Sequence, residues 1–267
     1  RPQSIRLARP STPFCSCKTT AGRLSIAGVV PLCETLDTVG PIARNVEDCA
    51  HLFAALEGVR PIDLSGGSLA GMRFLVLDTV ALDDLRERPA RGFDDALARL
   101  ARAGAKITRG GLPELSEAMS LTSTLVTAEA YGIWGPTVET APEKMFPRIL
   151  ERVRAGADVK ASDYVAAWRR LRVIRDLWAE MSAGYDAVML PTAAILPPDA
   201  NRLMTDFDYY ISENLLSLRN TRIGNLMDVC ALTLPTAEPS CGISFMAGPM
   251  QEDRLLRLGI RAERALA

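Results

Sequence analysis

Histidine is almost absent from this chain of 267 residues: His51 is the only one. A catalytic triad of serine, histidine and aspartate needs a histidine beside the nucleophile. His51 has no set of potential catalytic or metal-binding partners near it, and it lies in a segment with helical periodicity. We therefore expect it to be a surface or core residue of a helix and not a member of a triad. Cys15 and Cys17 lack the spacing of a zinc finger. We therefore predict no metal site and no cofactor.

An excess of charge is also missing. The 31 basic residues nearly cancel the 32 acidic ones, and only four of the basic residues are lysine. The arginines are spread along the chain and form no basic block, which argues against nucleic-acid binding through bulk charge. We expect no nucleic-acid partner.

The chain has no long apolar run. None approaches the roughly 20 residues that cross a bilayer, and no charged stretch followed by an apolar signal core opens the sequence. We therefore expect a soluble, cytoplasmic protein without a membrane partner. Six cysteines are scattered through a chain that is 48% hydrophobic, a pattern typical of buried, reduced thiols and not of a disulfide framework.

Short apolar runs alternate with segments of helical periodicity along most of the chain. We predict strands at residues 72–77, 106–109, 187–190, 230–234 and 243–246. We predict helices at residues 46–57, 92–102 and 252–266, with helical hairpins over 115–183. The order strand, helix, strand indicates an α/β sheet.

Glycine, proline and polar residues predict the connections. Residues 1–20 are rich in arginine, proline, serine and threonine and predict a loop, and residues 37–41 predict a tight turn. Asn45 is placed to cap the next helix and Gly58 to end it. The glycine–serine stretch 64–71 is not followed by the lysine of a phosphate-binding loop and directly precedes a predicted strand, so we expect a linker.

Several motifs in a fixed order carry a resemblance to a known family. Residues 18–25 are Lys-Thr-Thr-Ala-Gly-Arg-Leu-Ser, 28–32 are Gly-Val-Val-Pro-Leu, and 36–44 are Leu-Asp-Thr-Val-Gly-Pro-Ile-Ala-Arg. Residues 185–192, Asn225 with 232–235, and the helix at 252–266 fit the same pattern. Together these segments resemble the amidase-signature family of serine amidohydrolases, over residues 18 to 267.

The resemblance implies a mixed twisted sheet enclosed by helices in a single α/β domain. It also implies hydrolysis or transfer of a carboxamide nitrogen. The implied catalytic groups are a serine nucleophile, a bridging serine after a cis peptide bond, and a lysine that acts as base and then acid. The family's lysine and bridging serine lie upstream of the nucleophile and would precede Arg1. We therefore expect residues 1–267 to be the C-terminal part of one amidase domain, truncated at the N-terminus and inactive alone.

Ser4 is the candidate nucleophile that the resemblance implies. The segment Ser4–Arg6 reproduces the second half of the family's Gly-Gly-Ser-(Ile or Val)-Arg motif, and its distance from Lys18, which matches a structural lysine, agrees with the family. The pair Phe14-Cys15 comes three residues too late, and an alignment on that pair places Leu7 at the nucleophile position. Ser4 therefore depends on the alignment that follows Lys18.

The residues before Ser4 depart from the family pattern. Pro2 and Gln3 stand where glycines let backbone N–H groups converge on the oxyanion, and proline has no N–H to donate. The alternative is that Ser4 is an exposed serine of a frayed terminus. Three further lysines fall in segments that predict surface helix or strand edges: Lys106, Lys144 and Lys160.

Substrate selection in the family involves the C-terminal half, so the resemblance implies that residues 208–220, with Arg219, and Asn225 line an acyl pocket. The alternative is that these residues cap helices or lie as polar groups on the surface.

The first functional hypothesis is an amidase that hydrolyses a small-molecule linear amide through an acyl-serine. The alternatives are the catalytic subunit of a tRNA-dependent amidotransferase and a catalytically dead remnant or binding module. The sequence leaves the oligomeric state open, and a homodimer is one possibility.

Overall fold

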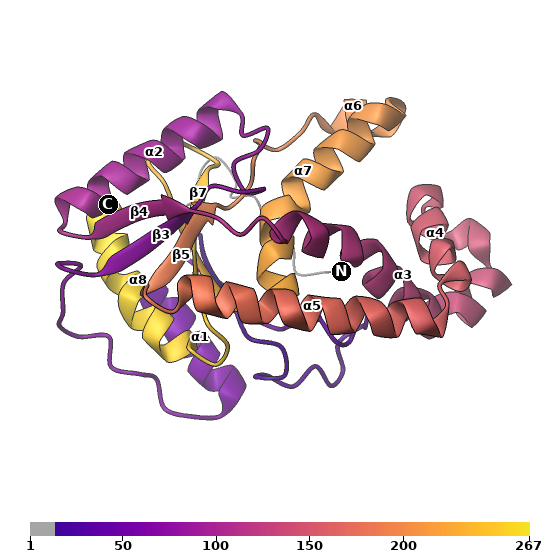
Figure 1. Ribbon diagram of the computed structural model, residues 1–267, viewed down its shortest axis with the longest axis horizontal. Helices are drawn as coiled ribbons and strands as arrows, with labels where there is room; N and C mark the ends of the chain where they lie inside the picture. The colour runs from indigo at the N-terminus through magenta and orange to yellow at the C-terminus, as the bar shows by residue number, and fades with distance from the viewer. Residues whose placement is uncertain (1–13) are drawn as a thin grey trace.

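A computed structural model describes residues 14–267 (Figure 1). In this part of the chain, seven strands form one sheet: β1 (Cys15–Lys18), β2 (Ile42–Ala43), β3 (Arg73–Leu77), β4 (Lys106–Gly110), β5 (Ala187–Pro191), β6 (Cys230–Pro235) and β7 (Gly242–Ala247). The helices are α1 (Val46–Glu57), α2 (Glu87–Arg102), α3 (Leu115–Thr140), α4 (Pro147–Arg154), α5 (Ala161–Ser182), α6 (Ala200–Thr205), α7 (Phe207–Leu226) and α8 (Glu252–Leu266). Two short 3-10 helices lie at Pro142–Lys144 and Ala155–Asp158.

The sheet is mixed, with the strand order β2-β1-β6-β7-β5-β3-β4. Strand β3 runs parallel to β4 and β5, whereas β7 is antiparallel to β5 and β6, and β1 is antiparallel to β6 and β2. Strands β3, β4, β5 and β6 therefore terminate at the same end of the sheet, and β1 and β7 begin there. We call this end the carboxyl end. The mixed α/β architecture that the resemblance implied is confirmed.

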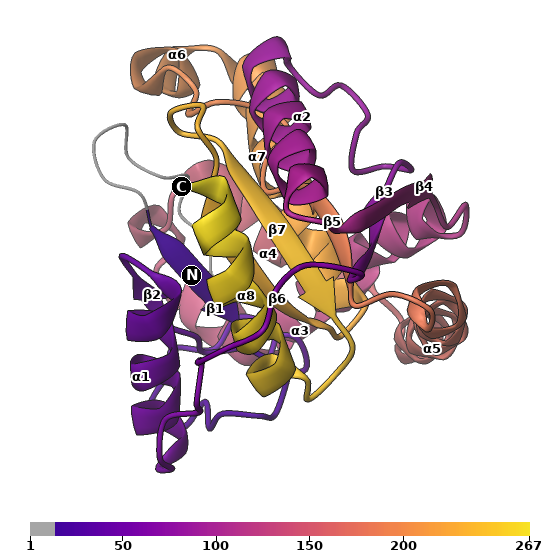
Figure 2. The same cartoon turned by 90° about the vertical axis from the view of Figure 1, so that its left-hand side faces the viewer.

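Helices cover both faces of the sheet. Helices α1, α2 and α8 pack on one face, with α1 and α8 side by side in Figure 2, and α3, α5 and α7 pack on the other. Alternate residues of β3 enter the two cores: Phe74 and Val76 on the α1 face, Leu75 and Leu77 on the α5 face. This period of two is that of a strand buried on both sides.

Helix α1 shows how local signals set its ends. The side chain of Asn45 accepts a hydrogen bond from the backbone N–H of Asp48 at 2.7 Å, which satisfies one of the free donors at the helix start. Gly58 ends the helix in the left-handed region at φ 75°, which favours glycine. Both predictions are confirmed, as are the bounds of α8 and the helical hairpins over 115–183.

Three details differ from the sequence-based expectations. Residues 15–18 were predicted as loop but form β1, because β6 and β2 supply hydrogen-bonding partners on both sides. The turn predicted at 37–41 lies earlier, where the N–H of Asp37 donates to the carbonyl of Cys33 at 2.7 Å and the Asp37 carboxylate accepts from two backbone N–H groups. Helix α2 begins at Glu87 and not near residue 92, because Pro89 is tolerated in a first helical turn.

Candidate active site

The carboxyl end of the sheet collects polar side chains from separate segments. Thr192 follows β5, Thr236 follows β6 and Ser240 precedes β7. In open α/β sheets, ligands bind outside the carboxyl ends of the strands. This end is therefore the expected place for a functional site.

A pocket lies at this end, between the start of β1 and the loop after β5. Ser16, Thr192, Thr233, Ser240 and Cys241 contribute hydroxyl or thiol groups to its lining, and the other lining residues are apolar or glycine. None of the described residues that line it carries a charge. The pocket thus offers neutral hydrogen-bonding groups against apolar walls.

Four buried hydroxyl groups, Ser16, Thr233, Ser244 and Thr192, form a row across the strands, which we call the hydroxyl row. Ser16 of β1 is paired with Thr233 of β6, and Thr233 is paired with Ser244 of β7. The Ser244 Oγ lies 2.8 Å from the Oγ1 of Thr192 and 2.9 Å from the Oγ1 of Thr233. The Ser16 Oγ at the end of the row is buried and has no hydrogen-bond partner in the described part of the chain.

Cys241 is the only thiol among the described lining residues of this pocket. Burial raises the pKa of Cys241 to about 11, so the group is a neutral thiol at physiological pH. A thiol is a poor nucleophile compared with a thiolate. Cys241 therefore serves the pocket as a small, weakly polar wall. The six cysteines are all buried and free, as their scattered positions predicted.

Asn220 of α7 holds two loops together beside the pocket. Its side chain is fully buried, and its Nδ2 donates to the carbonyl oxygen of Ala81 at 3.0 Å and to that of Pro191 at 2.7 Å. One amide group thus joins the loop after β3 to the end of β5. Asn220 lies in the stretch 208–220 that the resemblance predicted to line an acyl pocket. Nothing in the sequence indicated that it would bind these two carbonyl oxygens.

An ion pair between a buried carboxylate and a half-exposed guanidinium brings α7 to the same region. The Glu213 carboxylate is 1% exposed and pairs with the Arg86 guanidinium, with Nη1 at 2.9 Å from Oε2. The backbone N–H of Arg86 donates to the carbonyl of Ala194 in the loop after β5. The pair therefore fixes the loop that forms one side of the pocket.

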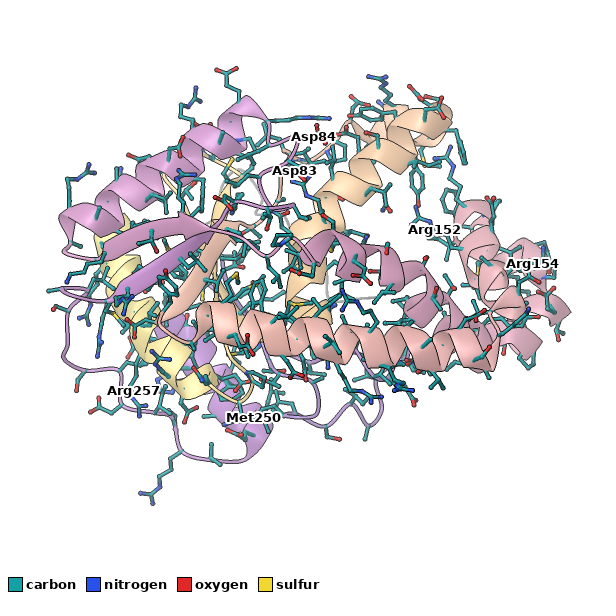
Figure 3. The ribbon with its side chains drawn as sticks, in the orientation of Figure 1. Asp83, Asp84, Arg152, Arg154, Met250 and Arg257 are labelled. Atoms are coloured by element: carbon teal, nitrogen blue, oxygen red, sulfur yellow. The ribbon has the colours of Figure 1, made fainter. Side chains whose placement is uncertain are left out.

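The two predicted substrate-binding residues lie on α7 but outside the pocket lining. Arg219 is half-buried and donates to the carbonyl of Ala81 at 3.2 Å and to the side chain of Asn220 at 3.1 Å. Burial lowers the pKa of Arg219, and the carboxylates of Asp83 and Asp84, labelled in Figure 3 on the loop between β3 and α2, oppose that shift.

Asn225 lies six residues further along the same helix. At 3.6 residues per turn, this spacing separates Arg219 and Asn225 by about 120° around the axis and about 9 Å along it. The structure therefore does not bring them together at one site. Their role in substrate binding stays a prediction.

The model of the Amidase family matches residues 13–256. This chain belongs to the amidase family.

Individual relatives agree with that assignment. The chain is 30% identical over 276 residues to a 2-amino-5-chloromuconic acid deaminase of Comamonas testosteroni, an alignment that covers 97% of this chain and 58% of that protein. It is 25% identical over 299 residues to a glutamyl-tRNA(Gln) amidotransferase subunit of Aliarcobacter butzleri, covering 97% of this chain and 65% of that protein. The chain thus spans about three fifths of the length of these relatives.

Solved structures show that the fold is that of the amidases. The crystal structure of an amidase superimposes with a TM-score of 0.81 at 22% sequence identity, covering 96% of this chain and 59% of the other. At this identity the likeness concerns the fold alone. It agrees with the mixed sheet and the two helical layers described above.

The candidate nucleophile Ser4 lies outside the described residues. Lys18 is buried, and its Nζ donates to the carbonyls of Thr19 at 2.9 Å and Val229 at 3.0 Å. Burial lowers the pKa of Lys18 to about 8. Among residues 14–267, no hydrogen bond joins a lysine Nζ to a serine hydroxyl, and the other three lysines are exposed.

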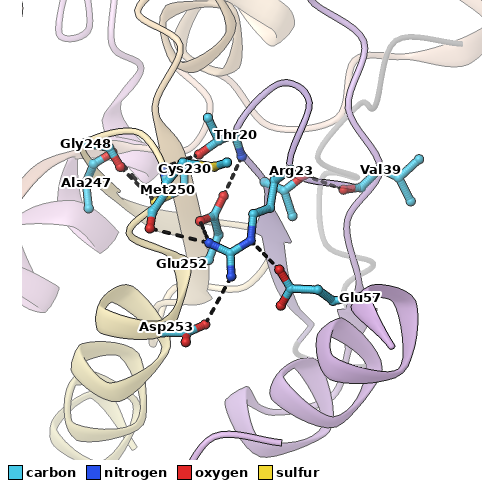
Figure 4. Close-up of polar contacts among 11 residues, drawn as sticks. Thr20, Arg23, Val39, Glu57, Cys230, Ala247, Gly248, Met250, Glu252 and Asp253 are labelled. Atoms are coloured by element: carbon cyan, nitrogen blue, oxygen red, sulfur yellow. Dashed lines mark hydrogen bonds and ion pairs between the residues drawn. The ribbon is translucent and has the colours of Figure 1, made fainter. Parts of the chain in front are cut away.

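The amidase motif at residues 18–25 has a structural role in the described chain. Figure 4 shows Arg23 between Glu57 of α1 and Glu252 at the start of α8, with Nε 2.5 Å from the Glu57 Oε1 and Nη1 3.2 Å from the Glu252 Oε2. The backbone N–H of Thr20 donates to the Glu252 Oε1 at 2.6 Å. The motif thus fastens the segment after β1 to two helices.

The remaining candidates for chemistry lie apart from the pocket. His51 is exposed on α1. Across residues 14–267, no group of three or more histidine, cysteine, aspartate or glutamate side chains is arranged to hold a metal ion. Over the same range, no helix is both long enough and apolar enough to span a bilayer.

Proposed function

We propose that this chain is part of an enzyme that hydrolyses the carbon–nitrogen bond of a linear amide through an acyl-serine intermediate. The observation that carries the proposal is the match to the Amidase family over residues 13–256. A pocket at the carboxyl end of the sheet supports it, since its lining among residues 14–267 is polar without charge and an amide is a neutral polar group. Ser4 is the proposed nucleophile.

The proposed chemistry has two steps. The Ser4 hydroxyl attacks the amide carbonyl carbon, a base takes the hydroxyl proton, and the amine leaves with a proton as the acyl-serine ester forms. Water then attacks the ester and releases the acid and the free serine. Donors of hydrogen bonds stabilise the oxyanion in both steps.

We also propose that residues 1–267 form the C-terminal part of one amidase domain and are inactive alone. The relatives that match are longer, and this chain covers 58% of the Comamonas deaminase. In the described part, no lysine contacts a serine hydroxyl by a hydrogen bond, so a serine–lysine relay needs groups from elsewhere. The base and the bridging serine would come from the upstream part of the domain.

Labelling with a fluorophosphonate probe, followed by peptide mass spectrometry, tests this proposal. The chain would be compared with a version extended upstream to include the family's lysine and bridging serine. We expect labelling of Ser4 in the extended version alone, and none after Ser4→Ala. Labelling of another serine would refute the assignment of Ser4. The absence of labelling in both versions would favour the catalytically dead remnant or binding module.

A second candidate is the catalytic subunit of a tRNA-dependent amidotransferase. The match to the Aliarcobacter amidotransferase protein over 97% of this chain favours it. Such a protein passes nitrogen to an aminoacyl-tRNA and needs partner subunits. Ammonia release by the extended version in the absence of other proteins would support the amidase over this candidate. A homodimer and a cytoplasmic location stay predictions, the former checked by light scattering.

A further inference from the structure

A glycine- and serine-rich loop lies in the connection between α1 and β3. Its residues 65–68 are Ser-Gly-Gly-Ser, and all four are exposed. Gly66 and Gly67 both adopt left-handed backbone angles, with φ 72° and 74°, which glycine reaches without strain. Figure 2 shows the connection passing in front of α8. The exposed peptide groups of the loop therefore lie beside that helix.

Arg261 of α8 packs on the backbone of this loop. A Cβ atom at Gly67 would overlap the Arg261 guanidinium, so the absence of a side chain there gives the guanidinium its place. The Arg261 Nε is buried and has no hydrogen-bond partner, and no carboxylate pairs with this guanidinium among residues 14–267. Residues 1–13 contain no aspartate or glutamate. The Arg261 charge is thus held against the loop without a counter-charge from this chain.

A second guanidinium lies one helical turn away. Arg257 precedes Arg261 by four residues, a spacing that places both on one face of α8, and its Nε donates to the carbonyl of Asp63 at 3.2 Å (labelled in Figure 3). Asp63 is the only acidic residue of the connection 59–71. Its carboxylate accepts the N–H of Ser65 at 2.8 Å, and this bond, with a smaller contribution from Arg257, lowers the pKa of Asp63. The one carboxylate of the connection is therefore already engaged by the loop.

The loop also has donors that the described chain does not use. The backbone N–H groups of Gly66, Gly67 and Ser68 make no hydrogen bond to any group among residues 14–267. The Ser68 Oγ accepts the N–H of Ala70 at 3.3 Å, which leaves the hydroxyl proton free to donate. Successive free N–H groups in a turn form concavities that bind anions. Neutral donors and two guanidinium groups thus lie together.

We propose that the loop 65–68 and the guanidinium groups of Arg257 and Arg261 bind a phosphate group. Guanidinium groups present paired N–H donors that match phosphate oxygens. The sequence lacks the lysine that follows the glycines of a phosphate-binding loop, and α8 supplies the cations in its place. The site goes beyond the proposed amide hydrolysis. Its loop leads into the start of β3, whereas the pocket lies at the carboxyl end of the sheet.

Inorganic phosphate and methyl phosphate are the probes. Their binding to the full chain would be measured by phosphorus NMR titration at low ionic strength and about pH 8, where both are mostly dianions. For so small a ligand held by exposed charges we expect a Kd on the order of 1–10 mM. Acetate, with a single charge, should bind at least about threefold more weakly. Tighter binding of methyl phosphate would support a site for phosphate esters, and tighter binding of the inorganic ion a site for free phosphate.

Gly66 and Gly67 supply a matched pair of variants. Alanine would be strained to the same degree at both, because their φ angles are nearly equal. A Cβ atom at Gly66 would meet no atom within 4 Å, whereas one at Gly67 would displace the Arg261 guanidinium. We expect Gly67→Ala and Arg261→Met to weaken phosphate binding at least about fivefold, and Gly66→Ala to change it less than about twofold.

Unchanged phosphate affinity in Arg261→Met, or equal losses of affinity in Gly66→Ala and Gly67→Ala, would overturn the proposal. Acetate binding as tightly as phosphate to the unaltered chain would also overturn it, and this comparison needs no variant. Thermal melting of each ligand-free variant checks its folding. Arg261→Met should not lower the Tm, because the buried Nε has no partner to lose. Labelling at Ser4 involves none of these residues, so the proposed function and the phosphate site can fail separately.

Discussion

Replacement of Glu252 tests whether the amidase motif after β1 holds the fold together. The Glu252 side chain is fully buried at the start of α8, where its Oε1 accepts from the Thr20 N–H and its Oε2 lies 3.2 Å from the Arg23 Nη1 (Figure 4). Arg23 itself is 18% exposed and also contacts Glu57 and, at 3.7 Å, Asp253. One buried carboxylate therefore serves both a backbone donor and a shared guanidinium.

The expected loss of stability follows from these contacts. Glu252→Gln keeps an oxygen for the Thr20 N–H but places an amide NH2, which cannot accept a hydrogen bond, opposite the Arg23 guanidinium. Hydrogen bonds to charged groups contribute about 1.5–3 kcal/mol, and Arg23 keeps two other carboxylates, so we expect a loss of about 2–3 kcal/mol. Glu252→Ala also leaves the Thr20 N–H without an acceptor, so its loss should reach about 3–5 kcal/mol.

Urea unfolding of the three proteins, analysed for the free energy of unfolding and the m-value, measures these losses. Asp253→Asn is the matched control, since this carboxylate is 44% exposed and its loss should cost less than about 1 kcal/mol. A double-mutant cycle with Arg23→Met isolates the coupling between Arg23 and Glu252. Equal losses for Glu252→Gln and Asp253→Asn would refute the reasoning.

Three further predictions concern Lys18, Asn220 and Gly40. Lys18 has a folded-state pKa of about 8, below its ordinary 10.5, so the unfolded chain binds more protons between these values. The free energy of unfolding should therefore rise by up to about 3 kcal/mol between about pH 8 and pH 10.5, relative to that of Lys18→Met. Urea titrations measure this change, and Lys144→Met, at an exposed position, is the control. Asn220→Ala should cost about 2–3 kcal/mol and lower the Tm, because two buried carbonyls lose their donor. Gly40→Ala should cost at least about 1 kcal/mol by the same assay, since its Cβ would lie 2.0 Å from the carbonyl oxygen of Cys17.

The fold could be predicted where its signals are local. The cap at Asn45, the end of α1 at Gly58 and the bounds of α8 depend on residues a few positions apart, and all were confirmed. Strand β1 was missed because its four residues carry no alternating pattern and its partner β6 lies near the other end of the chain. The start of α2 was misplaced because periodicity weakens in a first turn that contains Pro89.

The candidate site depends much more on long-range contacts. Ser16 is unremarkable in the sequence, and only its pairing with Thr233 makes it part of a buried row of hydroxyls. Asn220 and Arg219 are adjacent polar residues, and the sequence does not show which of them is buried. In the structure Asn220 is the fully buried one, and it donates to two carbonyl oxygens. Such roles follow from burial, which one position in a sequence does not reveal.

The sequence by itself determined the family of this protein and the order of most of its helices and strands, because ordered motifs and apolar periodicity are properties of neighbouring residues. Only the tertiary structure decided which polar groups meet. Strand register placed Ser16, Thr233 and Ser244 side by side, and the packing of α7 brought Asn220 to the carbonyls of Ala81 and Pro191. Both depend on contacts between distant segments, which no local pattern encodes.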